Sequence, residues 1–236
     1  MANSISVLVP AYNEEPNIKA ALDSVRHALD GKVEDYEVIV VDDGSVDRTG
    51  DLARMAATKD PRVQVVSHKV NQGYGIAFMT GLRAATKEYV TLFPGDNELA
   101  SSSFGEVVQA TGSADMIISY PAGGHKRSLL RRIVSKAYVI LLNVLFGYRL
   151  RYYNGAFVFK RSALEGIPIK STGLTIHSEC IIRLLRKGLS YREVPFLIAG
   201  RLGERSKAFS LKSVVTVVRA IAILVRDIYF PSRQES

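Results

Sequence analysis

The sequence Val38-Ile39-Val40-Val41-Asp42-Asp43-Gly44-Ser45 joins a run of apolar, β-branched residues to two carboxylates and a glycine. The apolar run predicts a buried strand, and the residues that follow predict a polar turn. Polar segments follow three other predicted strands in the same way, at residues 10–14, 71–73 and 94–98. Open α/β sheets bind nucleotides in the crevice at the carboxyl ends of their strands. The four segments together therefore predict a nucleotide site with a metal ion beside it.

Predicted strands alternate with predicted helices through the first half of the chain. Strands are expected at residues 5–9, 37–41, 63–66, 89–93 and 116–119, and helices at about 16–29, 47–58, 74–86 and 101–111. The alternation predicts a Rossmann-like, mostly parallel sheet flanked by helices, an α/β fold. We expect this domain over residues 1–200, followed by a basic loop and an amphipathic helix over residues 201–236. Another helix is expected at residues 180–187, after His177 and Glu179.

Charge is divided unevenly between the halves of the chain. Residues 1–124 hold 10 Lys and Arg against 17 Asp and Glu, a net charge of −7. Residues 125–236 hold 21 against 6, a net charge of +15. Such asymmetry predicts an anionic partner for the second half, and we favour an acidic membrane surface over nucleic acid because no nucleic-acid motif is recognised. The lone cysteine, Cys180, cannot form an internal disulfide and favours a reducing cytoplasmic location.

Two turns offer candidate contacts to a nucleotide. Asp42 and Asp43 can accept hydrogen bonds from a base or a ribose at the end of their strand. In the turn after the first predicted strand, Tyr12 could stack on a base and Glu14 could accept a further hydrogen bond. The alternative is that Asp43 and Ser45 only cap the next helix. We favour the nucleotide, because a cap rarely requires two adjacent carboxylates.

These motifs resemble the signature of family 2 glycosyltransferases, which have the GT-A fold. The resemblance covers about residues 5–215 and is carried in the first half by residues 8–14, 40–45, Asp47 and residues 71–73. Within the family the chain most resembles the polyprenyl-phosphate glycosyltransferases, a group that includes the dolichol-phosphate mannose synthases. That closer likeness is carried by residues 154–161, 178–179, 193–195 and 201–207.

The resemblance implies an inverting enzyme that moves a sugar from a nucleoside diphosphate of the UDP or GDP type to a polyprenyl phosphate. It also implies Mg²⁺ or Mn²⁺ as cofactor and a peripheral position at the cytoplasmic face of a membrane. Glu179 would face the sugar. The residues that would bind the donor are Pro10, Tyr12, Glu14, Asp42, Asp43, Asn71 and Gly73.

The sequence departs from the family pattern at two positions. Members usually carry Asp-X-Asp after the fourth strand, but Pro94 occupies the place of the first aspartate and Asp96 matches the second. Asp96 and Glu98 could still hold the metal, since one or two carboxylates suffice when phosphates and waters complete the shell. The alternative is a simple polar turn ahead of a helix. The second departure is Tyr74, where the family often has a lysine that grips the nucleotide.

A lipid phosphate acceptor would explain why no histidine or carboxylate lies in a recognisable general-base motif. A phosphate monoester carries about −1.5 to −2 charge at pH 7 and attacks without losing a proton. It needs neutralisation and orientation, and the resemblance assigns these roles most directly to Arg201, Ser206 and Lys207. Asp96, Arg201 and Lys207 are thus the candidate catalytic residues, and the other candidate acceptor contacts are Arg127, Arg131 and Arg205. The alternatives are a soluble transferase with a small-molecule or protein acceptor, and a non-catalytic module that binds nucleotide sugars.

Two segments bear on membrane binding. Residues 137–148 carry no charge, but these 12 residues are fewer than the ~20 that span a bilayer. In residues 211–230, basic side chains recur every seven positions and share one helical face. We expect a helix in the membrane interface, with apolar residues on its other faces. The alternative is a helix packed on the core with one wet stripe. The basic residues are Lys212, Arg219 and Arg226, and the apolar ones are Val215, Val218, Ala222 and Val225.

Overall fold

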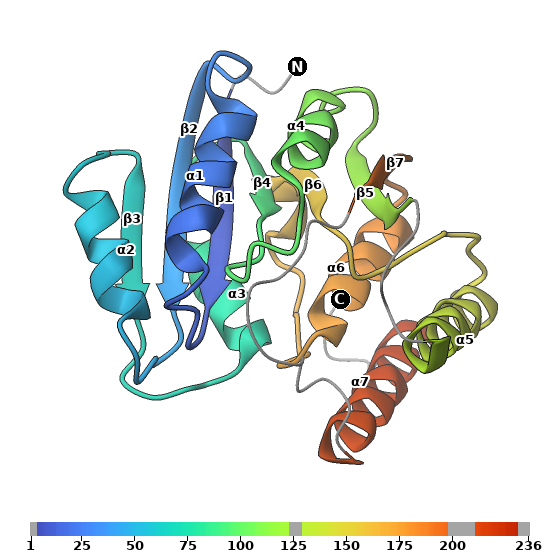
Figure 1. Ribbon diagram of the computed structural model, residues 1–236. Helices are drawn as coiled ribbons and strands as arrows, with labels where there is room; N and C mark the ends of the chain where they lie inside the picture. Colours follow the sequence, from blue (N-terminus) through green and yellow to red (C-terminus); the bar gives the residue numbers. More distant parts are fainter. Residues whose placement is uncertain (1–3, 123–128, 198–210, 231–236) are drawn as a thin grey trace.

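A sheet of seven strands, in the order β3-β2-β1-β4-β6-β5-β7, runs through the computed structural model (Figure 1). The structure describes residues 4–122, 129–197 and 211–230, without the side chains of residues 129–131 and 211–214. The strands are β1 (Ser4–Ala11), β2 (Asp35–Asp42), β3 (Val63–Ser67), β4 (Tyr89–Leu92), β5 (Met116–Pro121), β6 (Phe157–Lys160) and β7 (Tyr191–Phe196). The five predicted strands are confirmed, whereas β6 and β7 were not predicted.

The sheet is mostly parallel, as predicted. β1 pairs in parallel with β2 and β4, β2 with β3, and β5 with β7. Only β6, among the described strands, runs antiparallel to its neighbours β4 and β5. Parallel neighbours end at the same edge of a sheet, so the turns after β1 to β4 meet there. The four polar segments of the sequence are those turns.

Helices cover both faces of the sheet because alternate side chains of each strand enter different cores. Val7 and Val9 of β1 belong to one core, and Leu8 belongs to the other. On the Val7 side pack α1 (Ile18–Leu29), α2 (Thr49–Ala57) and α4 (Ser101–Gln109). On the Leu8 side pack α3 (Tyr74–Ala84), α5 (Leu129–Phe146), α6 (Thr175–Arg186), α7 (Leu211–Tyr229) and the short 3₁₀ helix η1 (Arg161–Leu164).

The α6 helix begins earlier than predicted. Ile176, Cys180 and Leu184 are four residues apart and all fully buried, so one apolar stripe extends the helix back to Thr175. His177 and Glu179 therefore lie within the first turns of α6, not ahead of it. The helix therefore fixes the directions in which these two side chains point.

The α7 helix lies beside α5 and α6 (Figure 1). The ring of Tyr229 stacks on Phe146 of α5 with centroids 6.3 Å apart, and the Tyr229 hydroxyl donates to the Leu145 carbonyl at 2.6 Å. Leu224 is buried in the core, and Val225 packs against it. Val225 is therefore on the packed face, whereas Val218 shares the exposed side with Arg219 and Arg226. No described helix combines the length and the apolar character needed to cross a membrane.

Candidate donor site at the carboxyl edge of the sheet

A cavity of about 430 Å³ opens at the carboxyl ends of β1 and β4. Its lining comes from all four predicted segments and from parts of the chain near residues 154, 174, 177 and 196. The predicted site residues that it brings together are Pro10, Tyr12, Glu14, Asp43, Asn71, Gly73, Asp96 and Glu98. The residues that the sequence pattern singled out in the four segments therefore share one cavity, and their roles there stay predictions.

The first wall is a turn after β1 that is tied to the segment after β2. The backbone N–H of Asn13, which has φ +54°, donates to Ser45 Oγ at 3.0 Å. The N–H of Glu14 donates to Thr49 Oγ1 at 2.8 Å. Ser45 is therefore not the cap of α2, which starts at Thr49. These bonds hold the backbone between Tyr12 and Glu14, whose side chains line the cavity.

Asp43 holds the second wall. One of its oxygens accepts the N–H of Gln72 at 2.9 Å and the other accepts that of Gly73 at 2.8 Å. Its carboxylate also lies 2.7 Å from His68 Nδ1, which must be the donor because the carboxylate has no proton. Asp43 therefore fixes the loop that carries Asn71 as well as lining the cavity itself.

Asp42 lies next to Asp43 but does not line the cavity. Its Oδ1 accepts the backbone N–H of Ser45 at 3.1 Å. A Cβ added to Gly50 of α2 would collide with the other oxygen, so the carboxylate points toward α2. Consecutive residues of a strand point to opposite faces. This alternation sends Asp43 toward the loop of residues 71–73 and Asp42 away from it.

The proposed metal-binding turn approaches β1 closely. A Cβ on Gly95 would lie 2.8 Å from the Pro10 carbonyl, so the approach requires glycine. The N–H of Glu98 donates to Asp96 Oδ1 at 3.1 Å, and Asn97 between them has φ +54°. The buried Oδ1 of Asn97 has no hydrogen-bond partner among the described residues. Both carboxylates line the cavity.

Two cavity residues from distant segments contact each other. Tyr74 Oη lies 2.8 Å from Nε2 of His177, which is 4% exposed. Burial lowers the pKa of His177 to about 4, so its imidazole is neutral at pH 7. The ring packs among Phe78 and Phe157. The sequence carries no signal for this contact, because 103 positions separate the two residues.

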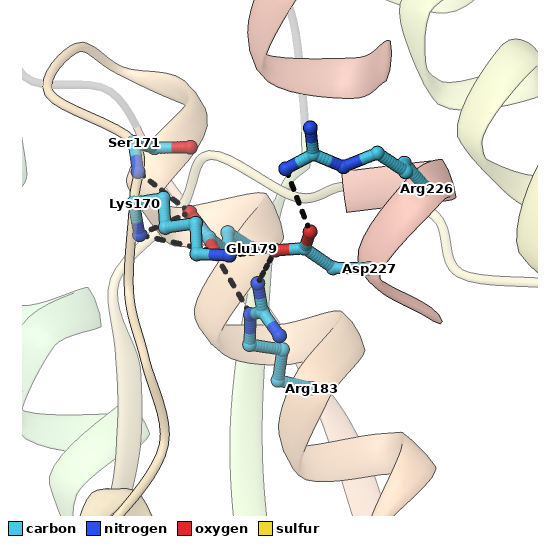
Figure 2. A network of polar contacts seen from close by, with 6 residues as sticks. All are labelled: Lys170, Ser171, Glu179, Arg183, Arg226 and Asp227. Carbon is cyan, nitrogen blue, oxygen red and sulfur yellow. Dashed lines mark hydrogen bonds and ion pairs between the residues drawn. The ribbon is translucent and has the colours of Figure 1, made fainter. Parts of the chain in front are cut away.

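Glu179 lies in a network of charges (Figure 2). It is not among the residues that line the cavity. Its carboxylate accepts the N–H groups of Lys170 and Ser171 and pairs with Arg183 Nε at 2.8 Å. Arg183 and Lys170 both reach Asp227 of α7, at 3.1 and 2.6 Å. The network therefore joins α7 to the loop that leads to Leu174 and His177.

The predicted acceptor residues have no described side chains. Arg127, Arg201, Arg205, Ser206 and Lys207 lie outside the described residues. The backbone of Arg131 lies in α5, but its side chain is not described. Tyr152, Leu174 and Phe196 also line the cavity, although they belong to none of the predicted segments. Asn154, which also lines the cavity, had appeared only as the start of a motif.

A family model described as glycosyl transferase family 2 matches residues 6–167. The chain belongs to glycosyl transferase family 2. Within it, the chain is similar to polyprenyl-phosphate glycosyltransferases. It is 26% identical to the dolichol-phosphate mannosyltransferase of Pyrococcus furiosus, over 86% of this chain and 58% of that protein. It is also 26% identical to the undecaprenyl-phosphate mannosyltransferase of Micrococcus luteus, over 91% and 93% of the two chains.

The structure of this family 2 glycosyltransferase is similar to solved GT-A structures. One is glucosyl-3-phosphoglycerate synthase from Mycobacterium tuberculosis, solved with Mn²⁺, UDP and glucosyl-3-phosphoglycerate. The TM-score is 0.70 at 23% identity, over 98% of this chain and 82% of that one, which confirms the fold. The chain spans 36% and 58% of the length of two curated relatives that it matches, the second being the Pyrococcus protein.

Asp43→Ala is expected to weaken the binding of UDP or GDP to this family 2 glycosyltransferase by about 1–3 kcal/mol, the cost of losing a buried hydrogen-bonding group. Asp42→Ala should weaken it less, because Asp42 does not line the cavity. Calorimetry on the two folded variants measures the difference. A larger loss in the Asp42 variant would assign the nucleotide contact to Asp42 instead, and an unchanged affinity in the Asp43 variant would remove Asp43 from the site.

Proposed function

We propose that this protein transfers a sugar, with inversion, from a nucleoside-diphosphate sugar to a polyprenyl phosphate at the cytoplasmic face of a membrane. The observation that supports it best is the gathering of Tyr12, Glu14, Asp43, Asp96 and Glu98 around one cavity at the carboxyl edge of the sheet. An aromatic ring and two carboxylates suit a nucleoside. Two further carboxylates beside them suit a metal-bound diphosphate.

The residues of the turn at 96–98 fit a hard divalent cation. Carboxylate and amide oxygens are the donors that Mg²⁺ and Mn²⁺ prefer. Asp96 and Glu98 would hold the ion, and Asn97 Oδ1, which has no partner in the part of the chain that the structure describes, is a further oxygen donor in the turn. Among the described residues, no group of three or more His, Cys, Asp or Glu is placed so that it could hold a metal ion. Diphosphate oxygens and waters would therefore complete the coordination. A bound ion would neutralise the charge that develops on the departing diphosphate.

A lipid phosphate is the acceptor that the charge and the relatives favour. The names of the two mannosyltransferase relatives state polyprenyl-type phosphates as their substrates. In the proposed reaction a phosphate oxygen of the acceptor bonds to the anomeric carbon while the bond from that carbon to the diphosphate breaks. Attack from the opposite side inverts the configuration, and no proton must be removed. Arg201 and Lys207 would neutralise and orient the acceptor phosphate.

An exposed apolar surface on α5 and α7 supports the membrane location. On α5, exposed apolar residues recur along one face and end at Val144, which is 76% exposed. On α7, Val215 and Val218 are exposed beside Arg219 and Arg226. Apolar side chains mixed with arginines suit an interface of acyl chains and acidic headgroups. The apolar residues of the α5 face are Ile133, Val134, Ala137, Ile140, Leu141 and Val144.

Val144→Glu together with Val218→Glu should abolish binding to liposomes that contain acidic lipid. The wild type should sediment with them and release in 1 M salt, where the Debye length falls to about 3 Å. As a control, Val46→Glu changes a valine that is 87% exposed and far from both helices in sequence, and this variant should sediment like the wild type. A wild type that never sediments with these liposomes would contradict the membrane location.

Arg201→Ala and Lys207→Ala should each reduce transfer to polyprenyl phosphate by about tenfold or more. This is the usual effect of losing a hydrogen bond between charged groups. Donor binding, measured by calorimetry, should change little. This separation tests the proposed acceptor role. Equal losses of donor binding would place both residues on the nucleotide, and unimpaired transfer by both variants would contradict their role.

A further inference from the structure

Tyr74 stands at a position where the backbone leaves it little freedom. Gly73 before it has φ +98° and donates its N–H to Asp43 at 2.8 Å. Gly75 after it donates its N–H to the Thr172 carbonyl oxygen at 2.9 Å. A Cβ on Gly75 would lie 2.5 Å from the Thr172 carbonyl carbon, so the close approach requires glycine. The first turn of α3 is thus held from both sides.

The contact with His177 sets the direction of the Tyr74 proton. A neutral imidazole carries one N–H, and Nδ1 of His177 is buried with no partner among the described residues. A proton on Nδ1 would leave a buried donor unpaired among aromatic rings, which native structures rarely tolerate. With the proton on Nε2, His177 donates to Tyr74 Oη. The phenol proton of Tyr74 is then free to donate to another group.

The cavity is the place from which a ligand group would reach this hydroxyl. Tyr74 lines it together with Asp96 and Glu98, where the proposed metal and diphosphate would lie. Burial, and to a lesser extent the charge of Asp96, raises the pKa of Tyr74. The hydroxyl therefore keeps its proton at neutral pH and remains a donor. An anionic oxygen entering the cavity is the acceptor that this geometry provides for.

We propose that Tyr74, oriented by His177, donates a hydrogen bond to a diphosphate oxygen of the nucleotide sugar. This inference rests on the proposed function and extends it, since Tyr74 stands where the family often has a lysine. A hydrogen bond from a neutral donor that is already oriented becomes stronger as negative charge develops on the leaving group. Tyr74 is thus a catalytic residue by contact, and His177 is a positioning residue that acts through it.

The test compares the affinities of a nucleoside diphosphate and the matching monophosphate by calorimetry, with Mn²⁺ present. Tyr74→Phe should weaken diphosphate binding by about tenfold, the usual weight of a hydrogen bond to a charged group. Monophosphate binding should stay within about twofold, because the nucleoside contacts remain. Turnover should fall at least as far as the diphosphate affinity.

His177→Phe keeps a ring in the packed pocket and removes the bond to Tyr74. It should cause part of the loss in diphosphate affinity that Tyr74→Phe causes. The double variant should bind the diphosphate no more weakly than Tyr74→Phe alone, because the two changes remove the same interaction. Tyr138→Phe is the matched control. It removes a tyrosine hydroxyl that lies 2.7 Å from Ser178 of the same helix α6, outside the cavity lining.

The possible outcomes distinguish a failure of this inference from a failure of the proposed function on which it rests. Wild-type affinity for the diphosphate in Tyr74→Phe would overturn the role of Tyr74 and leave the proposed function standing. Equal losses for diphosphate and monophosphate would overturn it too, by showing a purely structural role. Additive losses in the double variant would remove His177 from the inference. A wild type that binds no nucleoside diphosphate would overturn the proposed function and this inference with it.

Discussion

Asp96→Asn is expected to lower turnover by about two to three orders of magnitude, the loss seen when one group that stabilises developing charge is removed. Asp96 matches the one aspartate of the family's Asp-X-Asp pattern that this chain retains. Asparagine has nearly the same shape but lacks the negative charge that a divalent cation requires. Steady-state kinetics with saturating donor measures the loss, and an unchanged melting temperature shows that the fold survives.

Glu98→Gln should cost less than Asp96→Asn, because we assign Glu98 an assisting role. Glu106→Gln provides the control, since Glu106 is an exposed carboxylate on α4 and does not line the cavity. Excess EDTA should abolish wild-type activity, and added Mn²⁺ or Mg²⁺ should restore it. Full activity in EDTA, or an unimpaired Asp96→Asn enzyme, would show that the turn at residues 96–98 holds no catalytic metal.

Asp227→Asn is expected to lower the free energy of unfolding by about 1–3 kcal/mol at pH 7, because three basic side chains lose the carboxylate that they share. Asp227 and Arg183 are 12% and 11% exposed, and the pair joins α7 to α6 (Figure 2). Asp23→Asn is the control. It breaks an exposed pair with Arg26, which is worth less than about 1 kcal/mol. Urea denaturation of both variants measures the difference.

The same pair gives the stability a pH dependence of known sign. Burial would raise the pKa of Asp227, but hydrogen bonds from Lys170, Arg183 and Arg226 outweigh it and lower the pKa. A lowered pKa stabilises the folded protein above the unfolded value of about 3.9 and stops doing so as the pH falls through the folded value. The gap between wild type and Asp227→Asn should therefore narrow only below about pH 4. A gap that is constant down to pH 3, or absent at pH 7, would contradict the assigned role of the pair.

The sequence predicted those parts of the fold that carry a local signal. The runs that became β1, β2 and β4 are mainly apolar, because helices cover both faces of the sheet, and turn residues mark their ends. β6 has only four residues and enters the sheet antiparallel between β4 and β5, which no local pattern specifies. β7 is partly exposed and lacks a continuous apolar run. Tertiary pairing, not propensity, places these two strands.

The features of the site likewise divide into those with a local sequence signal and those without one. Strand ends locate the four polar turns, but the sequence could not decide between the neighbours Asp42 and Asp43, because the face that each occupies depends on the strand as folded. The contact between Tyr74 and His177 joins segments that only the packing of α3 on α6 brings together. Glu179 was expected to face the sugar, and its carboxylate is instead occupied by the backbone of Lys170 and Ser171 and by Arg183. Its proposed contact with the sugar stays untested.

The most direct test of the central claim is the identity of the product that the wild-type protein forms. The protein would be incubated with a panel of UDP and GDP sugars, Mn²⁺, and a short polyprenyl phosphate mixed with soluble acceptors such as phosphoglycerate and simple sugars. Mass spectrometry and NMR of the products should show a sugar joined through a phosphodiester to the polyprenyl chain, with its anomeric configuration inverted relative to the donor. Transfer to a soluble acceptor with the lipid left unmodified, or nucleotide binding with no transfer to any acceptor, would contradict the account.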